Sequence, residues 1–418
     1  MIFYYLLIWI LPRTNDPLWG HKIGPLTGFE CLGILTLAYA GFHLTISKRR
    51  HPFLLTWQAR TLIVLYLVAL VSALTKGKGI GLSNSALIIY TSATLLFFIT
   101  LALVDSLARL RWTLFVIVGS YAFTSLYLIR EWRVGRHIWV NFRPGWIAGD
   151  ANYFSAAAMC SILLSFYLMQ ARRPQWERLY YLGCLLITLV AFTLAASRGG
   201  FFGLAASSFL VIWHSRQRIR NFAILSVLVL PMLFLLPQSP IHRLLHPEIG
   251  AKESERYHLE AWTAGFQMIK SHPVTGIGLG NFKSEMPAYN LPGNTYDSIA
   301  HNMFIEVAAE LGLPAFVLFL AIFCSTYLAM GKIRNQSNSP PLVKTAASAL
   351  QAGLVGLAAS GCFVSAEYQK TTWSALAVMA CLVPLAKLRA PTTKPRVVVQ
   401  QDEMLTVEKD RLIEVVRD

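Results

Sequence analysis

Long apolar runs follow one another along almost the whole of this 418-residue chain. A helix that crosses a lipid bilayer needs about 20 mostly apolar residues. The sequence therefore predicts an all-α polytopic membrane protein with about twelve transmembrane helices, of which the first and the eighth are short. The predicted spans are centred near residues 9, 37, 65, 94, 121, 158, 187, 207, 229, 315, 355 and 380.

The composition favours a membrane protein over a soluble one. Hydrophobic residues make up 55% of the chain and charged residues only 14%, whereas a soluble protein carries about 25% charged residues. The same composition excludes a disordered chain, a collagen-like chain and a disulfide scaffold. A net charge of +16 would suggest nucleic acid in a soluble protein. Here it predicts contact with anionic membrane lipid and no nucleic-acid partner.

The basic residues predict an orientation, because cytoplasmic loops carry an excess of Lys and Arg. With the amino terminus inside, five short inner loops hold 3, 2, 3, 3 and 3 basic residues, and the tail from Lys387 adds seven. The short outer loops near residues 13–26, 76–83 and 196–199 hold 2, 2 and 1. We therefore expect one transmembrane domain over residues 1–388, with an outer loop over about 238–300, and a cytoplasmic tail over 389–418.

One predicted outer loop departs from this rule. The segment REWRVGRHIWVNFRPG carries Arg130, Arg133, Arg136 and Arg143. Four arginines on the outer side fit an anion-binding surface, because guanidinium groups bind phosphate and carboxylate groups well. A contact with lipid headgroups, or a solvated loop, is the alternative interpretation.

Other polar residues lie next to predicted spans on the same side. Arg198, in AASRGG, is followed by Gly199 and Gly200, which allow backbone or ligand to approach closely. This arrangement suits a phosphate or pyrophosphate, and an arginine that extends to the membrane interface is the alternative. Asp150 and Asn152, at the head of the sixth span, either cap that helix or contact sugar hydroxyls.

The long outer loop contains SERYHLEAWTAGFQMIKSHPVTGIGLGNF, which predicts a helix that ends at Pro273. Arg256 is expected in its first turn, at the edge of an apolar stripe. GIGLGNF follows a helix rather than a strand, so we interpret it as a turn by which the chain doubles back, and not as a phosphate loop. The predicted apolar stripe consists of Leu259, Trp262, Phe266 and Ile269.

The segment YDSIAHNMFIEVAAELG opens the tenth span. Asp297 or Ser298 is expected to cap this helix, with His301 in its first turn. The positive end of a helix disfavours imidazolium, so His301 would stay neutral and usable as a base, and a structural histidine is the alternative. Glu310 lies about 180° around the helix from His301, so we expect it to pair with a neighbouring helix or a loop amide.

These motifs together resemble the O-antigen ligase and polymerase superfamily, which are bacterial inner-membrane glycosyltransferases. The resemblance rests on SRGG, RYHLEAW…HPVTGIGLGNF and HNMFIEVAAELG, and covers roughly residues 150–330. It implies a GT-C-like helical fold with a periplasmic loop, His301 as the catalytic histidine, and Arg198 and Arg256 as ligands of the donor pyrophosphate. Further candidates for substrate binding are Arg136, Arg143, Asp150, Asn152, Tyr257 and Asn302.

The implied reaction is an inverting transfer of a glycan from undecaprenyl pyrophosphate to lipid A–core oligosaccharide, with no metal and no cofactor. The active site would be periplasmic and both termini cytoplasmic. A polymerase that joins lipid-linked repeat units, or a transferase acting on protein hydroxyls, uses the same donor and stays open. The single large outer loop favours a ligase. A transporter of anionic lipid is less favoured, because the sequence has no internal repeat and its candidate charges lie at one face.

Overall fold

The computed structural model describes residues 1–13, 15–23, 26–46, 56–76, 85–137, 142–215, 217–235, 249–289 and 297–388. Within these ranges a helix covers each of the twelve predicted centres. The predicted tail, 389–418, and residues 238–248 of the predicted outer loop lie outside the described residues. The twelve helices are α1 (Ile2–Ile10), α3 (Gly28–Ile46), α4 (Trp57–Lys76), α5 (Ser85–Leu103), α6 (Leu107–Gly135), α7 (Ala151–Gln170), α8 (Gln175–Leu194), α9 (Arg198–His214), α10 (Arg218–Leu235), α14 (Met303–Asn335), α15 (Pro341–Gly361) and α16 (Lys370–Leu385).

Eight helices of the described chain are long and apolar enough to cross a membrane: α3 to α8, α14 and α15. The protein is therefore an all-α, multi-helix chain with eight candidate membrane spans. Helix α1 has only nine residues and α16 has sixteen, so the figure of twelve spans stays a prediction. The remaining elements are short or lie in connections: α2 (Pro17–Gly20), the two-residue strands β1 (Lys22–Ile23) and β2 (Leu26–Thr27), the 3₁₀ turns η3 (Trp146–Ala148) and η4 (Ala366–Tyr368), α12 (Ile249–Ser271) and α13 (Phe282–Tyr289).

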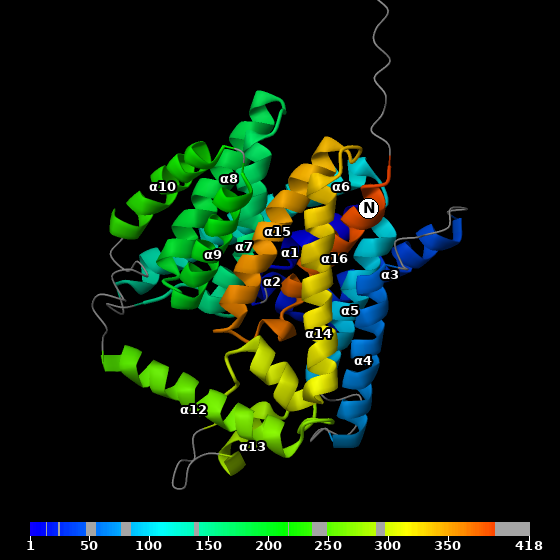
Figure 1. Ribbon diagram of the computed structural model, residues 1–418, viewed down its shortest axis with the longest axis vertical. Helices are drawn as coiled ribbons and strands as arrows, with labels where there is room; N and C mark the ends of the chain where they lie inside the picture. Colours follow the sequence, from blue (N-terminus) through cyan, green and yellow to red (C-terminus); the bar gives the residue numbers. More distant parts are fainter. Residues whose placement is uncertain are drawn as a thin grey trace, which may run out of the picture.

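Helix α15 runs through the bundle and packs on α7, α9 and α14 (Figure 1). Small residues let α9 and α15 approach closely, as is common between membrane helices. A Cβ atom added at Gly203 would lie 2.5 Å from the carbonyl oxygen of Gly356. One turn later in α9, the Ser207 hydroxyl donates a hydrogen bond of 2.9 Å to the carbonyl of Ala352.

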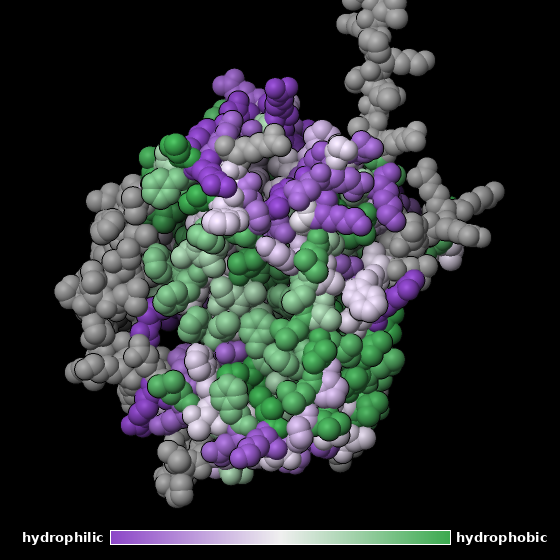
Figure 2. Space-filling model, in the orientation of Figure 1, coloured by the Kyte–Doolittle hydropathy of each residue, from purple (hydrophilic) through white to green (hydrophobic). Residues whose placement is uncertain are grey.

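On the face shown in Figure 2, an apolar band crosses the middle of the molecule between two polar ends. Contacts show at which of these two ends some of the connections between helices lie. At the end that carries α12 and α13, the Lys76 ammonium donates to the carbonyl of Gly276 at 2.8 Å. At the other end, the buried Glu177 pairs with Arg111 and with Arg173, the latter at 2.7 Å. The end of α4 thus lies at one polar end, and the start of α6 and the α7–α8 connection lie at the other, as expected for helices that cross a bilayer.

Helix α14 is kinked, and the GIGLGNF turn packs into the kink. The kink lies at Gly312, which has a φ of 83°, and is followed by Pro314. Proline has no amide hydrogen, so the carbonyl of Glu310 has no partner within the helix. The amide of Gly278 donates to it at 3.0 Å, and the amide one residue earlier in the turn donates to the preceding helical carbonyl at 2.9 Å. The turn therefore replaces hydrogen bonds that the kink removes.

Candidate functional site

Arg198 is the first residue of α9, directly after a tight turn from α8. Ala196 in this turn has a left-handed backbone, with a φ of 49°, and the Ser197 side chain accepts a hydrogen bond of 3.1 Å from the amide of Gly200. The half-buried Arg198 guanidinium therefore belongs to a capped helix amino terminus, where a positive end attracts anions. The space beside Gly199 is filled by the protein itself: an added Cβ would lie 2.7 Å from the Cβ of Phe363.

A second cationic residue ties this turn to α7. The Nε atom of Arg143 donates to the carbonyl of Ala195 at 2.9 Å, and its Nη2 donates to Oδ1 of Asn152 at 2.8 Å. Asp150 is the N-cap of α7, and its Oδ1 accepts from the Asn152 amide at 2.6 Å. The structure thus brings Arg143, Asp150 and Asn152 together beside the turn that precedes Arg198.

The other arginines of this predicted outer loop do not join that network. Arg136 ends α6, is exposed, and stacks over the Trp132 ring at 4.6 Å. Arg130 and Arg133 are also exposed. Sequence reasoning missed Glu131, which accepts hydrogen bonds of 2.9 to 3.2 Å from three consecutive backbone amides, those of residues 145–147. In the sequence, the only indication of this role is that Glu131 is the single acidic residue of a segment with four arginines.

His301 lies just before α14 and not in its first turn, so this expectation was wrong. Its backbone is left-handed, with a φ of 47°. The helix is capped by Asn302, whose Oδ1 accepts from the amides of Phe304 and Ile305 at 3.0 and 3.2 Å. Neither Asp297 nor Ser298 is the N-cap, because one further turn of chain separates them from the helix.

Helix α12 begins earlier than expected, at Ile249, so Arg256 lies in its third turn and not in its first. The Arg256 side chain is 68% exposed and pairs with Glu260 at 3.1 Å. Its guanidinium carbon lies 5.7 Å from the ring centre of Tyr257. Both contacts are on its own helix, so Arg256 is positioned at the surface rather than inside the cluster around His301.

The predicted apolar stripe of α12 is partly exposed and partly packed against the bundle. Leu259 is 61% exposed and Phe266 60% exposed, whereas Ala261 and Ala264 are buried. The helix packs through small residues against α13 and the start of α14. The other two stripe residues, Trp262 and Ile269, are partly buried against this cluster. Exposed apolar side chains such as Leu259 and Phe266 can face lipid in a membrane protein.

Two residues of α12 contact the segment that bears His301. The His258 ring lies 4.9 Å from the His301 ring in an edge-to-face arrangement. One turn later, Nε1 of Trp262 donates to the carbonyl of Ala300 at 3.1 Å. The Trp262 ring also lies 6.2 Å from the ring of Phe363, the residue that fills the space beside Gly199. These aromatic contacts connect the His301 segment to the turn that bears Arg198.

The surroundings of His301 favour its neutral form. Burial lowers the pKa of His301 below the ordinary histidine value, and the negative charge of Asp150 opposes that shift only partly. An imidazole that is neutral at neutral pH has a free lone pair and can accept a proton.

Buried carboxyl groups form a further cluster that sequence reasoning did not assemble. Glu310 accepts from the amide of Phe282 at 3.1 Å and from the hydroxyl of Tyr368, and Glu306 accepts from the hydroxyl of Ser365. Glu310 therefore binds a loop amide and a connection between helices, and not His301. The nearby Glu367 is 1% exposed, and burial together with the charge of Glu306 raises its pKa well above the usual carboxyl range.

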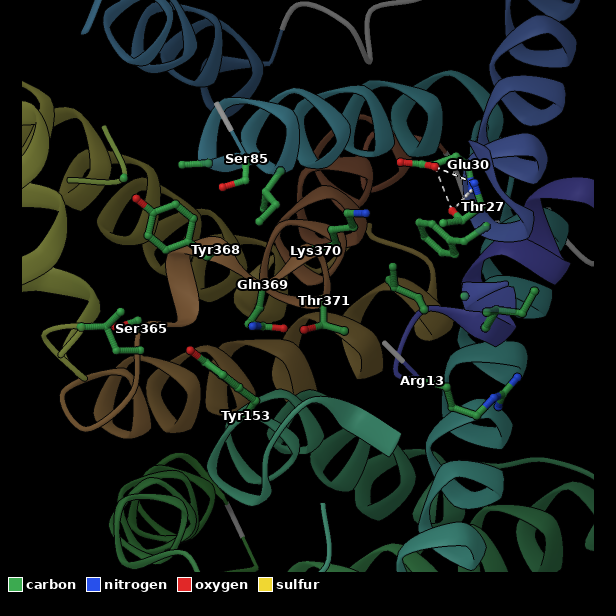
Figure 3. Close-up of a pocket in the computed structure, with 18 of the residues that line it drawn as sticks. Arg13, Thr27, Glu30, Ser85, Tyr153, Ser365, Tyr368, Gln369, Lys370 and Thr371 are labelled. Carbon is green, nitrogen blue, oxygen red and sulfur yellow. Dashed lines mark hydrogen bonds between the residues drawn. The ribbon is translucent and has the colours of Figure 1, made fainter. Parts of the chain in front are cut away.

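A cavity of about 570 Å³ lies beside this cluster, among α3, α5, α7 and the start of α16 (Figure 3). Its lining reaches Ile299, two residues before His301, and Tyr153, three residues after Asp150. Among the described residues that line it, none is His301, Arg198 or Arg256. Of the residues named from the sequence, Glu310 lines the cavity, and His301 and Asp150 lie within three residues of lining positions. The other lining residues were not predicted.

Comparison with known proteins adds one match. A family model described as O-antigen ligase matches residues 183–320, which run from α8 into α14. None of the curated proteins searched matches the chain. The matched segment contains Arg198, Arg256 and His301, and the family spans O-antigen ligases and polymerases. The resemblance seen in the sequence is therefore confirmed over residues 183–320, where the chain is similar to the O-antigen ligase family.

Proposed function

We propose that this protein is an inverting glycosyltransferase that moves a glycan from undecaprenyl pyrophosphate to lipid A–core oligosaccharide. One observation carries the proposal. His301, which burial keeps neutral, is connected through Trp262 and Phe363 to the α9 amino terminus that bears Arg198. A base that shares one packed segment with a cationic helix end suits transfer from a pyrophosphate donor.

In the proposed reaction, an acceptor hydroxyl attacks the anomeric carbon of the donor sugar. The new carbon–oxygen bond forms as the bond to the pyrophosphate oxygen breaks, and the hydroxyl proton passes to the His301 imidazole. Since the attack comes from the face opposite the leaving group, the anomeric configuration inverts. Proton removal by a positioned base contributes roughly 10²- to 10⁴-fold to such a rate.

The two arginines have different proposed tasks. Arg198, at the positive end of α9, would stabilise the charge that builds on the leaving pyrophosphate. Losing such a contact costs roughly 10²- to 10³-fold in rate. Arg256 is largely exposed and paired with Glu260, so it would bind donor phosphate by exchanging that carboxylate for the substrate. Neither step calls for a metal ion or a cofactor.

The proposed setting is the bacterial inner membrane, with both termini cytoplasmic and the site on the periplasmic side. Support comes from the count of basic residues in the short loops. It also comes from the division of connections between the two ends of the bundle, which puts Lys76 and the α12–α13 segment together. The donor and acceptor of this reaction are both membrane lipids, so a site at one end of a bundle suits them.

The test uses purified full-length protein in lipid nanodiscs, with undecaprenyl-pyrophosphate glycan and lipid A–core. Core-linked glycan is the expected product, and both His301→Ala and His301→Asn should lose roughly 10²- to 10⁴-fold of the rate. Asparagine tolerates a left-handed backbone, so His301→Asn separates loss of the base from loss of the turn. The matched control is His272→Asn, at an exposed histidine beyond the end of α12.

Identifying the acceptor distinguishes the two activities that the matched family spans, those of a ligase and of a polymerase. High-molecular-weight polymer on the lipid carrier, made without lipid A–core, would assign a polymerase. Full transfer activity in His301→Ala would remove the assignment of the base.

A further inference from the structure

We infer that the cavity beside His301 binds the carbohydrate segment of a substrate. The inference rests on the proposed function for the reaction that it serves, but the binding itself can be measured without that reaction. At about 570 Å³ the cavity falls within the usual range for small-ligand sites, about 300 to 1,000 Å³.

The lining has the chemistry that a sugar needs. Sugar rings carry hydroxyl groups that both donate and accept hydrogen bonds, and they have apolar C–H faces. The cavity supplies hydrogen-bonding side chains from Ser85, Gln369 and Thr371, and aromatic rings from Tyr153 and Tyr368. Figure 3 shows Gln369, Lys370 and Thr371 in the middle of the lining, with the two tyrosines on one side and Thr27 and Glu30 on the other.

The charges in the cavity argue against a polyanion or a lipid tail. Three basic residues share the lining with three acidic ones: Arg13, Lys283 and Lys370 with Glu30, Glu306 and Glu310. The Lys370 ammonium lies 4.6 Å from the ring centre of Phe29. Because the basic and acidic residues of the lining are equal in number, it offers a polyanion no excess of positive charge. Its many polar groups would be left unsatisfied by a hydrocarbon chain. A hydroxyl-rich ligand of low charge satisfies both kinds of group. The side chain of Gln369, the N-cap residue of α16, makes no capping hydrogen bond. Its amide group can therefore form hydrogen bonds with a ligand.

The position of the cavity suits delivery of a hydroxyl to His301. One wall reaches Ile299, and another reaches Tyr153, on the helix that Asp150 caps. Most of the lining, including Thr27, Glu30 and Lys370, lies outside residues 183–320, the segment that holds the proposed catalytic residues. We therefore assign carbohydrate selectivity to the parts of the chain outside the matched segment.

The direct test measures binding by saturation-transfer NMR on full-length protein in detergent. Two soluble probes are used separately: core oligosaccharide freed of lipid A, and the glycan released from the lipid-linked donor. Ser85→Trp places an indole in the cavity at an exposed position and should abolish the signal of the probe that binds. The control is Ile88→Trp, on the same helix but 49% exposed and outside the lining.

Milder variants keep the test valid if Ser85→Trp does not fold. Gln369→Leu and Thr371→Val each remove hydrogen-bonding capacity and should weaken binding about 2- to 10-fold. Loss of the core signal assigns the cavity to the acceptor, and loss of the glycan signal assigns it to the donor. The KM of the same substrate should rise while kcat changes less.

The inference is wrong if neither probe binds the wild-type protein, or if the folded variants bind as the wild type does. Failure of the wild-type protein to form core-linked glycan or lipid-linked polymer would instead refute the proposed function, and cavity-dependent sugar binding would stand.

Discussion

Trp262 of α12 donates a hydrogen bond of 3.1 Å to the carbonyl of Ala300, the residue immediately before His301. His301 has a left-handed backbone, a conformation that non-glycine residues adopt only where their surroundings hold it. The indole fixes the peptide on one side of this strained residue, and the Asn302 cap fixes the other. The position of the proposed base therefore depends on α12 as much as on α14.

We expect Trp262→Phe to lower kcat of transfer with little change in KM. The aromatic packing on Phe363 is retained, but the hydrogen bond to Ala300 is lost, and a hydrogen bond of this kind contributes about 0.5–1.5 kcal/mol. This corresponds to roughly a 2- to 10-fold change. Steady-state transfer assays measure the effect, with Trp176→Phe, at an exposed tryptophan of α8, as the control. An unchanged kcat would show that Trp262 does not position His301.

The pH dependence of transfer should report the environment of His301. Burial lowers the pKa of His301 below the ordinary value of 6.5, and the charge of Asp150 raises it. The acid limb of the kcat/KM profile should therefore lie below pH 6.5. Asp150→Asn keeps a side chain that can cap α7 but removes the charge, so the limb should move to still lower pH.

The control for this profile is Asp105→Asn, because Asp105 pairs with Arg109 at 2.9 Å in the connection between α5 and α6. It should leave the acid limb in place. A limb that moves upward in Asp150→Asn would contradict the assignment of His301 as the titrating base.

We expect Arg143→Lys to destabilise the protein and to slow transfer. The guanidinium donates to both Ala195 and Asn152, whereas one ammonium cannot reproduce this fork. A buried acceptor left unsatisfied costs about 1–3 kcal/mol. Thermal unfolding in detergent measures the loss, and Arg133→Lys, at an exposed position, is the matched control. Equal melting temperatures for the two variants would rule out a bridging role for Arg143.

The close contact between α9 and α15 should tolerate no added methyl group. In Gly203→Ala the new Cβ would lie 2.5 Å from the backbone oxygen of Gly356, so the two helices must move apart. We expect a loss of about 1–3 kcal/mol of stability. At Gly183 of α8 nothing lies within 4 Å of the added atom, so Gly183→Ala should be neutral or slightly stabilising. A Gly203→Ala variant as stable as Gly183→Ala would contradict this packing.

Helix positions were predictable because the length and polarity of a run are local properties of the chain. Features that depend on distant segments were not. Asn302 caps α14 in place of Asp297 or Ser298, and the following amide, of Met303, donates to the carbonyl of Val364 at 3.2 Å. The sequence near His301 offers several residues that could cap the helix. The cap that forms, Asn302, is found together with a contact to the segment after α15, and this contact cannot be read from the local sequence.

The site was predicted only in part for the same reason. Arg198 and His301 were found because a charged or titratable residue at the edge of an apolar run is conspicuous. The cavity was not predicted, because Glu30, Tyr153 and Lys370 come from segments that are far apart in sequence. Each of these residues is unremarkable in its own helix, and only the packing of those helices makes them neighbours.

The turn that packs into the kink of α14 limits how the site can open. Gly278 and Glu310 share a backbone hydrogen bond. This bond links the segment that bears α12 to the first part of α14. If a bulky lipid-linked molecule displaces this segment, either the hydrogen bond breaks or the beginning of α14 moves together with the segment. In the second case His301 would travel with the incoming substrate, and admission and alignment would be a single movement.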